Sequence, residues 1–374
     1  MPAETGTLIA GRYRLSEPVG QGATARVWRA RDTVGDREVA VKELLLPAQS
    51  PQQRADLAAA VIREVQAAAR LDHPSAVTIH DVAEQEGTAW IVMELIPGRS
   101  LAAEITESGP LPWQRAARIG EQVADALAHA HAAGLVHGDL TPASILLASA
   151  PVPSADRAIV TDFAIDRVLD ATAGAPGPGT GPRRDTAPYV APERWEDAPV
   201  GPPADLWSLG AILYQAVEGT PPFASSTITA TMAAILARPP APPKHAGPLA
   251  GLIDSLLAKD PAARPTATAA ATLATLAASG TSAATPAGLN PAGTPIDLNP
   301  AGPQPSRPAR PGFHPVETLT AFTRANPRLA VGLVTAVVMI AALILVITLF
   351  PSHKKSQSPG GHPASPVTSA SASR

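Results

Sequence analysis

Residues 137–147 read HGDLTPASILL, residues 159–164 read IVTDFA, and residues 191–193, about 30 positions later, read APE. Each stretch is too short to be specific by itself. Their order along the chain, and the segments that precede them, decide how the sequence is interpreted.

A glycine-containing stretch, VGQGATARV, occupies residues 19–27 and follows a strand-like run from Tyr13 to Val19. Glycines at the tip of a hairpin let backbone N–H groups approach phosphate oxygens. The third glycine of such a pattern is replaced by Ala25. Taken alone, this stretch is better explained by an ordinary hairpin turn.

The next segment, EVAVK at 38–42, alternates as a strand, with Val39 and Val41 on one face and Ala40 and Lys42 on the other. Lys42 is the only lysine before residue 244, although arginine is frequent throughout this part of the chain. A charge on a short apolar strand needs a partner or a ligand. The position of this lysine therefore favours a functional role over chance.

A helix is predicted over residues 51–71, with an apolar stripe that contains one carboxylate, Glu64. The members of this stripe are Leu57, Val61, Glu64, Ala68 and Leu71. A carboxylate on a buried face is costly unless it is paired, so Lys42 is its natural partner. The alternative is a glutamate at a solvated edge of the helix.

Together these stretches resemble the signature set of protein kinases, and in style the bacterial, eukaryotic-like (Hanks-type) serine/threonine kinases. Two further stretches belong to the same pattern, DLWSLG at 205–210 and KDPAARP at 259–265. The resemblance covers residues 12–275. It implies an α+β, bilobal protein-kinase fold, with a small lobe over 12–96 and a large lobe over 97–275.

The resemblance also implies roles for the charged residues, with ATP and Mg²⁺ (or Mn²⁺) as the bound groups. Lys42, steadied by Glu64, would hold the α- and β-phosphates, and Asp139 would accept or orient the proton of the substrate hydroxyl. The metal ion would be bound by Asp162, with Ser144 as a second ligand.

The remaining implied positions bind the nucleotide or support the large lobe. Backbone groups of Glu94 to Pro97 would form the hinge that binds the adenine edge. The residues implied in ATP binding are Val19, Gly20, Gly22, Val27, Ala40, Lys42, Met93, Glu94 and Leu146. Glu193 and Arg264 would form a structural ion pair, and Asp205 would brace the loop of Asp139.

Four positions depart from the family pattern: Gly138, Thr141, Ser144 and Ala164. Gly138 replaces an arginine that normally pairs with a phosphorylated activation segment. Thr141 replaces a lysine that reaches the γ-phosphate, and Ser144 replaces an asparagine that binds the second metal. Ala164 replaces the glycine of the DFG motif, which restricts the backbone of that turn.

These departures leave two classes of function open. The first is an active serine/threonine kinase, favoured by the four charged residues, Lys42, Glu64, Asp139 and Asp162. The second is a pseudokinase that binds nucleotide or serves as a scaffold, favoured by the altered catalytic loop. In the activation segment, Thr172 and Thr180 are the candidate phosphorylation sites.

The last hundred residues have a different character. Residues 279–326 are rich in Pro, Ala and Gly and are expected to form a disordered linker. Residues 329–350 form an uncharged apolar run that would span about 33 Å as a helix, against about 30 Å of hydrocarbon. A single transmembrane helix is predicted here; a buried core helix is the alternative. Residues 351–374 would form a short tail.

Composition sets the outer limits. The formal net charge is −3 with no basic stripe, so no nucleic-acid partner is expected, and the absence of cysteine excludes disulfides and thiolate chemistry. No signal peptide is recognised at the N-terminus. We therefore expect a single-pass protein of the cell membrane, with its kinase domain in the cytoplasm and its tail outside. Expected partners are protein substrates with Ser or Thr and, as a further possibility, a second copy of the chain.

Overall fold

The computed structural model describes residues 3–22, 25–45, 50–148, 156–163, 185–196 and 200–281. The chain divides into two units, Met1–Ile296 and Asp297–Arg374, and all described residues belong to the first. Within them, no helix is long and apolar enough to cross a membrane. Ala164, Thr172, Thr180, the linker after Thr281, the apolar run 329–350 and the tail 351–374 lie outside the described residues.

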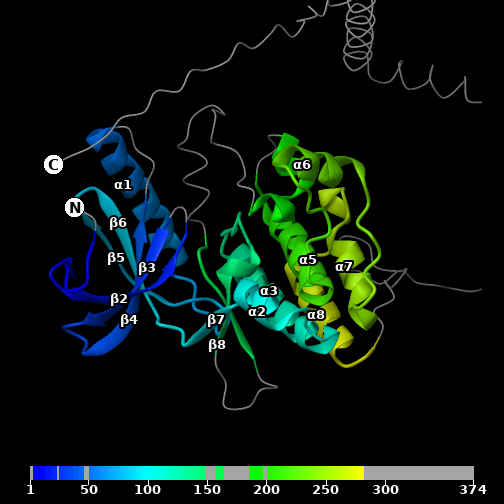
Figure 1. Ribbon diagram of the computed structural model, residues 1–374, viewed down its shortest axis with the longest axis horizontal. Coiled ribbons are helices and arrows are strands. Elements are labelled where there is room, and N and C mark those ends of the chain that lie inside the picture. Colours follow the sequence, from blue (N-terminus) through cyan, green and yellow to red (C-terminus); the bar gives the residue numbers. More distant parts are fainter. Residues whose placement is uncertain are drawn as a thin grey trace, which may run out of the picture. The chain divides into compact units, whose positions relative to one another are not determined.

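The small lobe is an antiparallel six-stranded sheet in the order β1-β2-β3-β4-β6-β5 (Figure 1). Its strands are β1 Leu8–Ile9, β2 Tyr13–Gln21, β3 Ala25–Asp32, β4 Arg37–Leu44, β5 Ile79–Gln85 and β6 Thr88–Met93. The predicted alternation in β4 is present. Val39 and Val41 join an apolar cluster with Tyr13 and Trp28 on one face, while Ala40 and Lys42 lie on the other.

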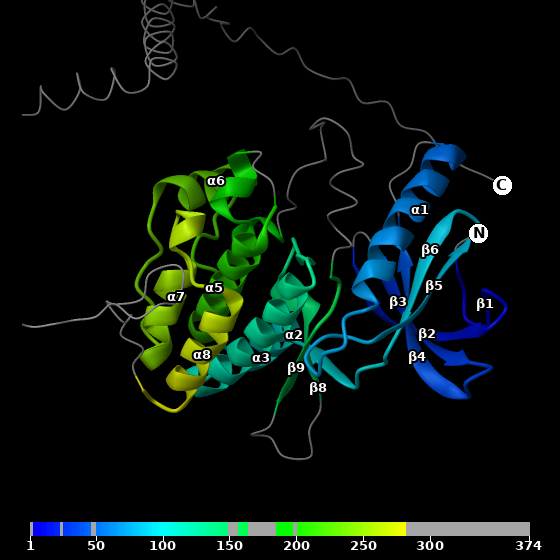
Figure 2. The same ribbon diagram turned by 180° about the vertical axis from the view of Figure 1, so that it is seen from behind.

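Helix α1, Pro51–Ala68, packs against this sheet (Figures 1 and 2). It begins at Ser50, whose side-chain oxygen accepts a hydrogen bond from the N–H of Gln53. Val61 and Val65 are fully buried against Leu44 and Ile91. Apolar packing therefore fixes the rotation of α1 about its axis.

The predicted stripe on this helix was wrong in part. The buried residues are Ala58, Val61, Val65 and Ala68, whereas Leu57 and Glu64 are only half-buried. The helix is rich in alanine, so two overlapping faces satisfy the same spacing, and the residues that pack against the sheet choose between them. Glu64 consequently lies at the edge of the buried face.

The large lobe is mainly helical (Figure 2). Its helices are α2 Leu101–Ser108, α3 Trp113–Ala132, α5 Pro202–Glu218, α6 Ile228–Ala237, α7 Ala250–Leu256 and α8 Ala267–Ala278. Helix α5 is buried along most of its length and ends at Gly219, whose left-handed backbone (φ 82°) suits a helix C-terminus. Its Trp207 ring stacks on Phe223 with centroids 5.5 Å apart.

A three-stranded sheet stands at the edge of the large lobe next to the small lobe. Its order is β7-β8-β9, with β7 Gly98–Ser100, β8 Ile145–Ala148 and β9 Arg157–Val160. Val77 donates its N–H to the carbonyl of Val160, and Val160 donates to Ser75, both at 2.9 Å. An apolar cluster of Ala40, Val77, Met93 and Ile159 completes the junction. The expected bilobal α+β architecture is thus confirmed.

The close pairing of β7 with β8 predicts that Gly98→Ala destabilises the fold. A Cβ atom at Gly98 would lie 2.1 Å from the carbonyl oxygen of Leu147, so the strands must separate. We expect a loss of about 1–3 kcal/mol in the free energy of unfolding, measured by urea denaturation.

The matched control is Gly22→Ala, at an exposed position where the nearest atom to the new Cβ is 3.7 Å away. This variant should change the free energy of unfolding by no more than about 0.5 kcal/mol. Equal stability of the two variants would contradict the described pairing.

Candidate functional site

A cavity of about 790 Å³ lies between the two lobes. Its lining comes from the glycine stretch, strands β3, β4 and β6, the connection to β7, the start of α2, strand β8 and the segment after β9. The lining residues are Val19, Gly20, Val27, Arg29, Glu38, Ala40, Lys42, Val77, Met93, Glu94, Leu95, Ile96, Pro97, Gly98, Arg99, Ser100, Ala103, Ala143, Leu146, Thr161 and Asp162.

Most of the residues predicted to bind nucleotide line this cavity. Val19, Gly20, Val27, Ala40, Lys42, Met93, Glu94, Leu146 and Asp162 do so. Gly22, Glu64, Asp139 and Ser144 are not among the lining residues. Sequence reasoning missed Val77, Ala103 and Thr161, which no local motif distinguishes because they reach the cavity only through packing of the lobes.

The inner part of the cavity is apolar and suited to a flat ring. Val27 and Ala40 come from the small-lobe sheet, and Leu146 comes from β8 in the large lobe. The N–H of Glu94 donates to the carbonyl of Thr78 at 2.9 Å. The Glu94 backbone can therefore accept a hydrogen bond from a ligand at its carbonyl oxygen, but its N–H is already used.

The opposite end of the cavity carries an ion pair between the lobes. Lys42 Nζ lies 2.6 Å from Asp162 Oδ1, and their side chains are 12% and 27% exposed. Burial disfavours the charge on Asp162, yet the neighbouring Lys42 holds the pKa of this carboxyl below its usual range. Asp162 has a left-handed backbone (φ 70°), which is unusual for a residue with a side chain.

The expected ion pair between Lys42 and Glu64 was wrong. Among the described residues, the ion pairs within 4.0 Å include Lys42 with Asp162 but not Lys42 with Glu64. Glu64 stands at the edge of the buried face of α1, where water reduces the cost of its charge. Asp162 instead provides the carboxylate that the buried lysine requires.

The loop that carries Asp139 is held by Asp205, in the first turn of α5. One oxygen of this buried carboxylate accepts hydrogen bonds from the N–H of His137 at 2.9 Å and from Nε2 of His131 at 2.8 Å. The other accepts from the N–H of Gly138 at 2.8 Å. Bonds to a carboxylate are roughly twice as strong as neutral ones, so Asp205 fixes the backbone immediately before Asp139.

His137 connects this loop to the segment of Asp162. Its Nε2 donates to the carbonyl of Thr161 at 2.9 Å, and its Nδ1 accepts from the N–H of Asp139 at 3.3 Å. The ring is therefore the tautomer with its proton on Nε2. It also contacts the ring of Phe163, with centroids 5.1 Å apart. The two aspartates predicted to be functional are thereby held by one side chain.

Ser144, predicted as a second metal ligand, is hydrogen-bonded within its own turn. Its hydroxyl donates to the carbonyl of Thr141 at 2.8 Å and accepts from the N–H of Thr141 at 3.0 Å, and it is buried. This closed pair of bonds stabilises the turn at Pro142–Ser144. The hydroxyl is thus used by its own loop.

Glu193 and Arg264 form a bidentate ion pair with N–O distances of 2.7 and 2.8 Å. The guanidinium also donates to the carbonyls of Pro203 and Ala258, at 2.7 and 2.9 Å. Arg264 therefore ties the segment 192–196 to the start of α5 and to the segment after α7.

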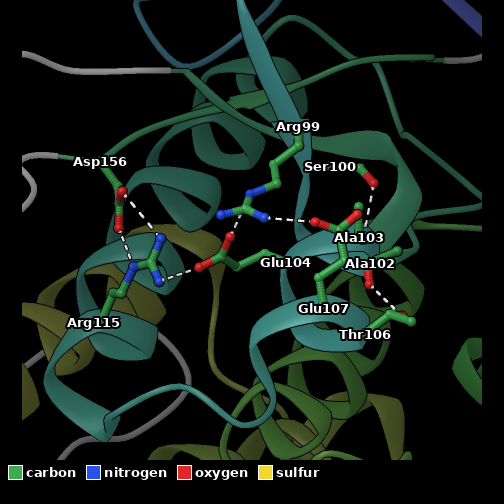
Figure 3. A network of polar contacts seen from close by, with 9 residues as sticks. All are labelled: Arg99, Ser100, Ala102, Ala103, Glu104, Thr106, Glu107, Arg115 and Asp156. Carbon is green, nitrogen blue, oxygen red and sulfur yellow. Dashed lines mark hydrogen bonds and ion pairs between the residues drawn. The ribbon is translucent and has the colours of Figure 1, made fainter.

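A second charged network joins β7, α2 and α3 (Figure 3). Glu104, which is buried, lies between Arg99 at 2.6 Å and Arg115 at 2.5 Å. Arg115 also pairs with Asp156, which raises the pKa of its guanidinium, and Arg99 reaches Glu107 at 2.8 Å. These bonds hold Arg99 and Ala103, both lining residues, in place.

The donor set of the cavity fits one hard cation. Asp162 offers a carboxylate oxygen in the lining, as Mg²⁺ prefers, and a nucleotide supplies further oxygens. Within the described part of the chain, no group of three or more His, Asp or Glu side chains is arranged to hold a metal. A metal ion there would depend on the phosphates for most of its ligands.

Comparison with known families gives one match that covers the globular part of the chain. The model described as "Protein kinase domain" matches residues 13–274. A crystal structure of Rad53 1–466 in complex with AMP-PNP has a TM-score of 0.56 and 27% sequence identity, covering 70% of this chain and 64% of that one.

Bacterial relatives with similar sequences are named serine/threonine-protein kinases. PknA of Mycobacterium tuberculosis is 36% identical over 271 residues, which are 71% of this chain and 60% of the relative. PkaA of Streptomyces coelicolor is 35% identical, covering 69% and 48%. PrkC of Bacillus subtilis is 34% identical, covering 58% and 32%. The chain thus spans less than two thirds of the length of each.

The Lys42–Asp162 pair predicts a specific dependence of stability on pH. Because the native pKa of Asp162 lies below its unfolded value, the pair stabilises the fold above the unfolded pKa, about 3.9. This contribution is lost as the pH falls through the native pKa. The free energies of unfolding of wild type and Asp162→Asn, measured by urea denaturation, should differ by a constant amount from pH 7 to about 5 and should converge as the pH falls through about 3.9 towards 2.

The control is Asp36→Asn, at a side chain that is 86% exposed. Its difference from wild type should stay small throughout. A difference for Asp162→Asn that stays constant or grows as the pH falls from about 5 to about 2 would contradict the described ion pair.

Proposed function

The chain belongs to the protein kinase family, and on that premise we propose that it is a membrane-anchored serine/threonine kinase. It transfers the γ-phosphoryl group of ATP to Ser or Thr hydroxyls of protein substrates. The observation that carries this proposal is the ion pair of Lys42 and Asp162 at 2.6 Å inside the cavity, tied through His137 to the loop of Asp139.

One end of the cavity would bind the adenine ring of ATP and the other its phosphates. Val27, Ala40 and Leu146 enclose the adenine ring, and the backbone of residues 94–97 binds its edge. Lys42 holds phosphate oxygens as a compact point charge, below the glycine stretch at Gly20. The terminal phosphate would then lie towards the large lobe.

The chemical step depends on position and charge. Asp139 accepts or orients the proton of the substrate hydroxyl, and Asp162 would hold the Mg²⁺. A metal ion held there would supply positive charge to offset that of the phosphates. Since phosphoryl transfer needs little covalent chemistry from the protein, the clamp of Asp205 on the loop supports catalysis by fixing where Asp139 stands.

One observation favours a second candidate function, that of a pseudokinase that binds nucleotide with little or no transfer. The hydroxyl of Ser144 is bonded to the backbone of Thr141 and does not line the cavity. With Thr141 in place of a lysine as well, both the second metal ligand and one phosphate contact are weakened. Such losses together could raise the barrier by several kcal/mol, with each ~1.4 kcal/mol slowing transfer tenfold.

Transfer of label from [γ-³²P]ATP tests the first function against the second. The full-length chain, purified in mild detergent with Mg²⁺ or Mn²⁺, should label itself or a generic protein substrate on Ser or Thr. Asp139→Asn should reduce kcat roughly 10²- to 10⁴-fold, because the proton acceptor is lost. Peptide mapping of the labelled chain then tests Thr172 and Thr180 as modification sites.

Asp36→Asn serves as the control, since this exposed carboxylate lies in the turn between β3 and β4. It should retain wild-type transfer. A rise in melting temperature with ATP, but no label under any condition, would establish the pseudokinase and overturn the proposed activity.

Membrane anchoring rests on the uncharged apolar run 329–350, which is long enough to cross a bilayer. We propose that the kinase domain lies in the cytoplasm, where ATP is available, and that residues 351–374 lie outside. The kinase would then act on substrates near the inner face of the cell membrane.

Deleting residues 329–350 should release the chain from the membrane. We expect the intact chain to stay in the membrane fraction after carbonate extraction, and the deletion variant to be soluble, because it lacks the apolar segment. Deletion of residues 282–303, which has the same length, is the control and should leave the chain in the membrane fraction. Release of the intact chain by carbonate would contradict the anchor.

A further inference from the structure

The peptide group that joins Gly138 to Asp139 is bound on both of its sides. Its carbonyl, from Gly138, accepts a hydrogen bond from Nη1 of Arg194 at 2.5 Å. Its N–H, from Asp139, donates to His137 Nδ1 at 3.3 Å. The shorter bond involves a charged donor and is therefore the stronger of the two. The orientation of the peptide that leads into Asp139 thus depends chiefly on Arg194.

Gly138 makes this external restraint necessary. It has no side chain, and its backbone is left-handed (φ 84°), a region that glycine enters without strain. A glycine is also the residue with the most conformational freedom to lose. Asp205 restrains the N–H of Gly138. It does not restrain the ψ angle of Gly138, which sets the direction of the carbonyl and the position of Asp139.

Neighbouring contacts position Arg194 next to the carbonyl of Gly138. It lies in the short 3₁₀ segment Pro192–Glu196, and its N–H donates to the carbonyl of Ala191 at 3.1 Å. The preceding residue, Glu193, is held in the bidentate pair with the buried Arg264. Two adjacent side chains therefore point to different partners: Glu193 anchors the segment, and Arg194 bonds to the catalytic loop.

We propose that Arg194 is a positioning residue for Asp139, acting from the segment 192–196 through the carbonyl of Gly138. This inference rests on the proposed phosphotransfer by Asp139. Arg194 acts through the Gly138 carbonyl and is absent from the lining of the nucleotide cavity. Its loss should therefore slow the chemical step without weakening ATP binding.

The test is the steady-state kinetics of Arg194→Met in the full-length chain. Methionine keeps much of the length of the side chain but has no donor. A displacement of the catalytic group on the order of 1 Å can cost about 100-fold in rate, so we expect kcat to fall about 10- to 100-fold. The KM for ATP should change by less than about twofold, which is the pattern for an interaction that acts in the transition state.

Two further variants separate positioning from a merely structural role. Arg194→Lys, which retains a charged donor, should recover part of the lost kcat. In Arg194→Ala, added methylguanidinium should raise kcat in a saturable manner, because a free guanidinium can occupy the vacated space beside the Gly138 carbonyl. The matched control is Arg118→Met, at an exposed arginine of α3, which should have wild-type kinetics.

The outcomes are distinct. Unchanged kcat in Arg194→Met, with an active wild type, would overturn the inference alone. Loss of kcat together with a raised KM for ATP and a lower melting temperature, without rescue by lysine or methylguanidinium, would also overturn it in favour of a structural role. A wild type without transfer would overturn the proposed function and this inference with it.

Discussion

The buried carboxylate of Asp205 is the constraint on which the rest of the site depends. It stands in the first turn of α5, where the helix N-terminus favours negative charge, and it accepts three hydrogen bonds. A carboxylate that is only 1% exposed would be very costly without these donors. The same bonds fix the backbone of His137 and Gly138 relative to the helical core. The rigid helix α5 thereby positions a loop whose own side chains provide few restraints.

From this fixed loop the organisation extends to both aspartates. The ring of His137 forms hydrogen bonds to the backbone of Thr161 and of Asp139. Lys42 then reaches across from the small lobe to Asp162. The cavity is therefore closed at its charged end by a contact between lobes. In the cavity without ligand, the positive charge of Lys42 is already paired with Asp162. A polyphosphate and its cation would therefore compete with this ion pair, the phosphate for Lys42 and the cation for Asp162.

The altered residues of the catalytic loop form a consistent set. At Gly138, Thr141 and Ser144 the loop lacks the side chains that kinases of this type use to contact phosphate and metal. In their place the structure uses backbone bonds: Ser144 closes on Thr141, Asp205 holds the N–H of Gly138, and Arg194 holds its carbonyl. The catalytic loop is therefore held in place by hydrogen bonds to its backbone at the positions where the side chains typical of the family are replaced.

The sequence by itself determined the family, the two lobes and most of the residues that line the cavity, because the kinase motifs are local and follow one another in a fixed order. The strand of Lys42, the apolar positions Val27, Ala40 and Leu146, and the aspartates 139 and 162 could all be identified without coordinates. The alternation of β4 followed from its period of two. The rotation of α1 about its axis could not be predicted, because its alanines allow two alternative buried faces. For this reason the expected Lys42–Glu64 ion pair was wrong. The ion pair of Lys42 with Asp162 and the bond from Arg194 to Gly138 join residues far apart in the chain. Only tertiary structure decided them, because the partner that a buried charge selects is set by distance and burial in the folded chain, which no local pattern records.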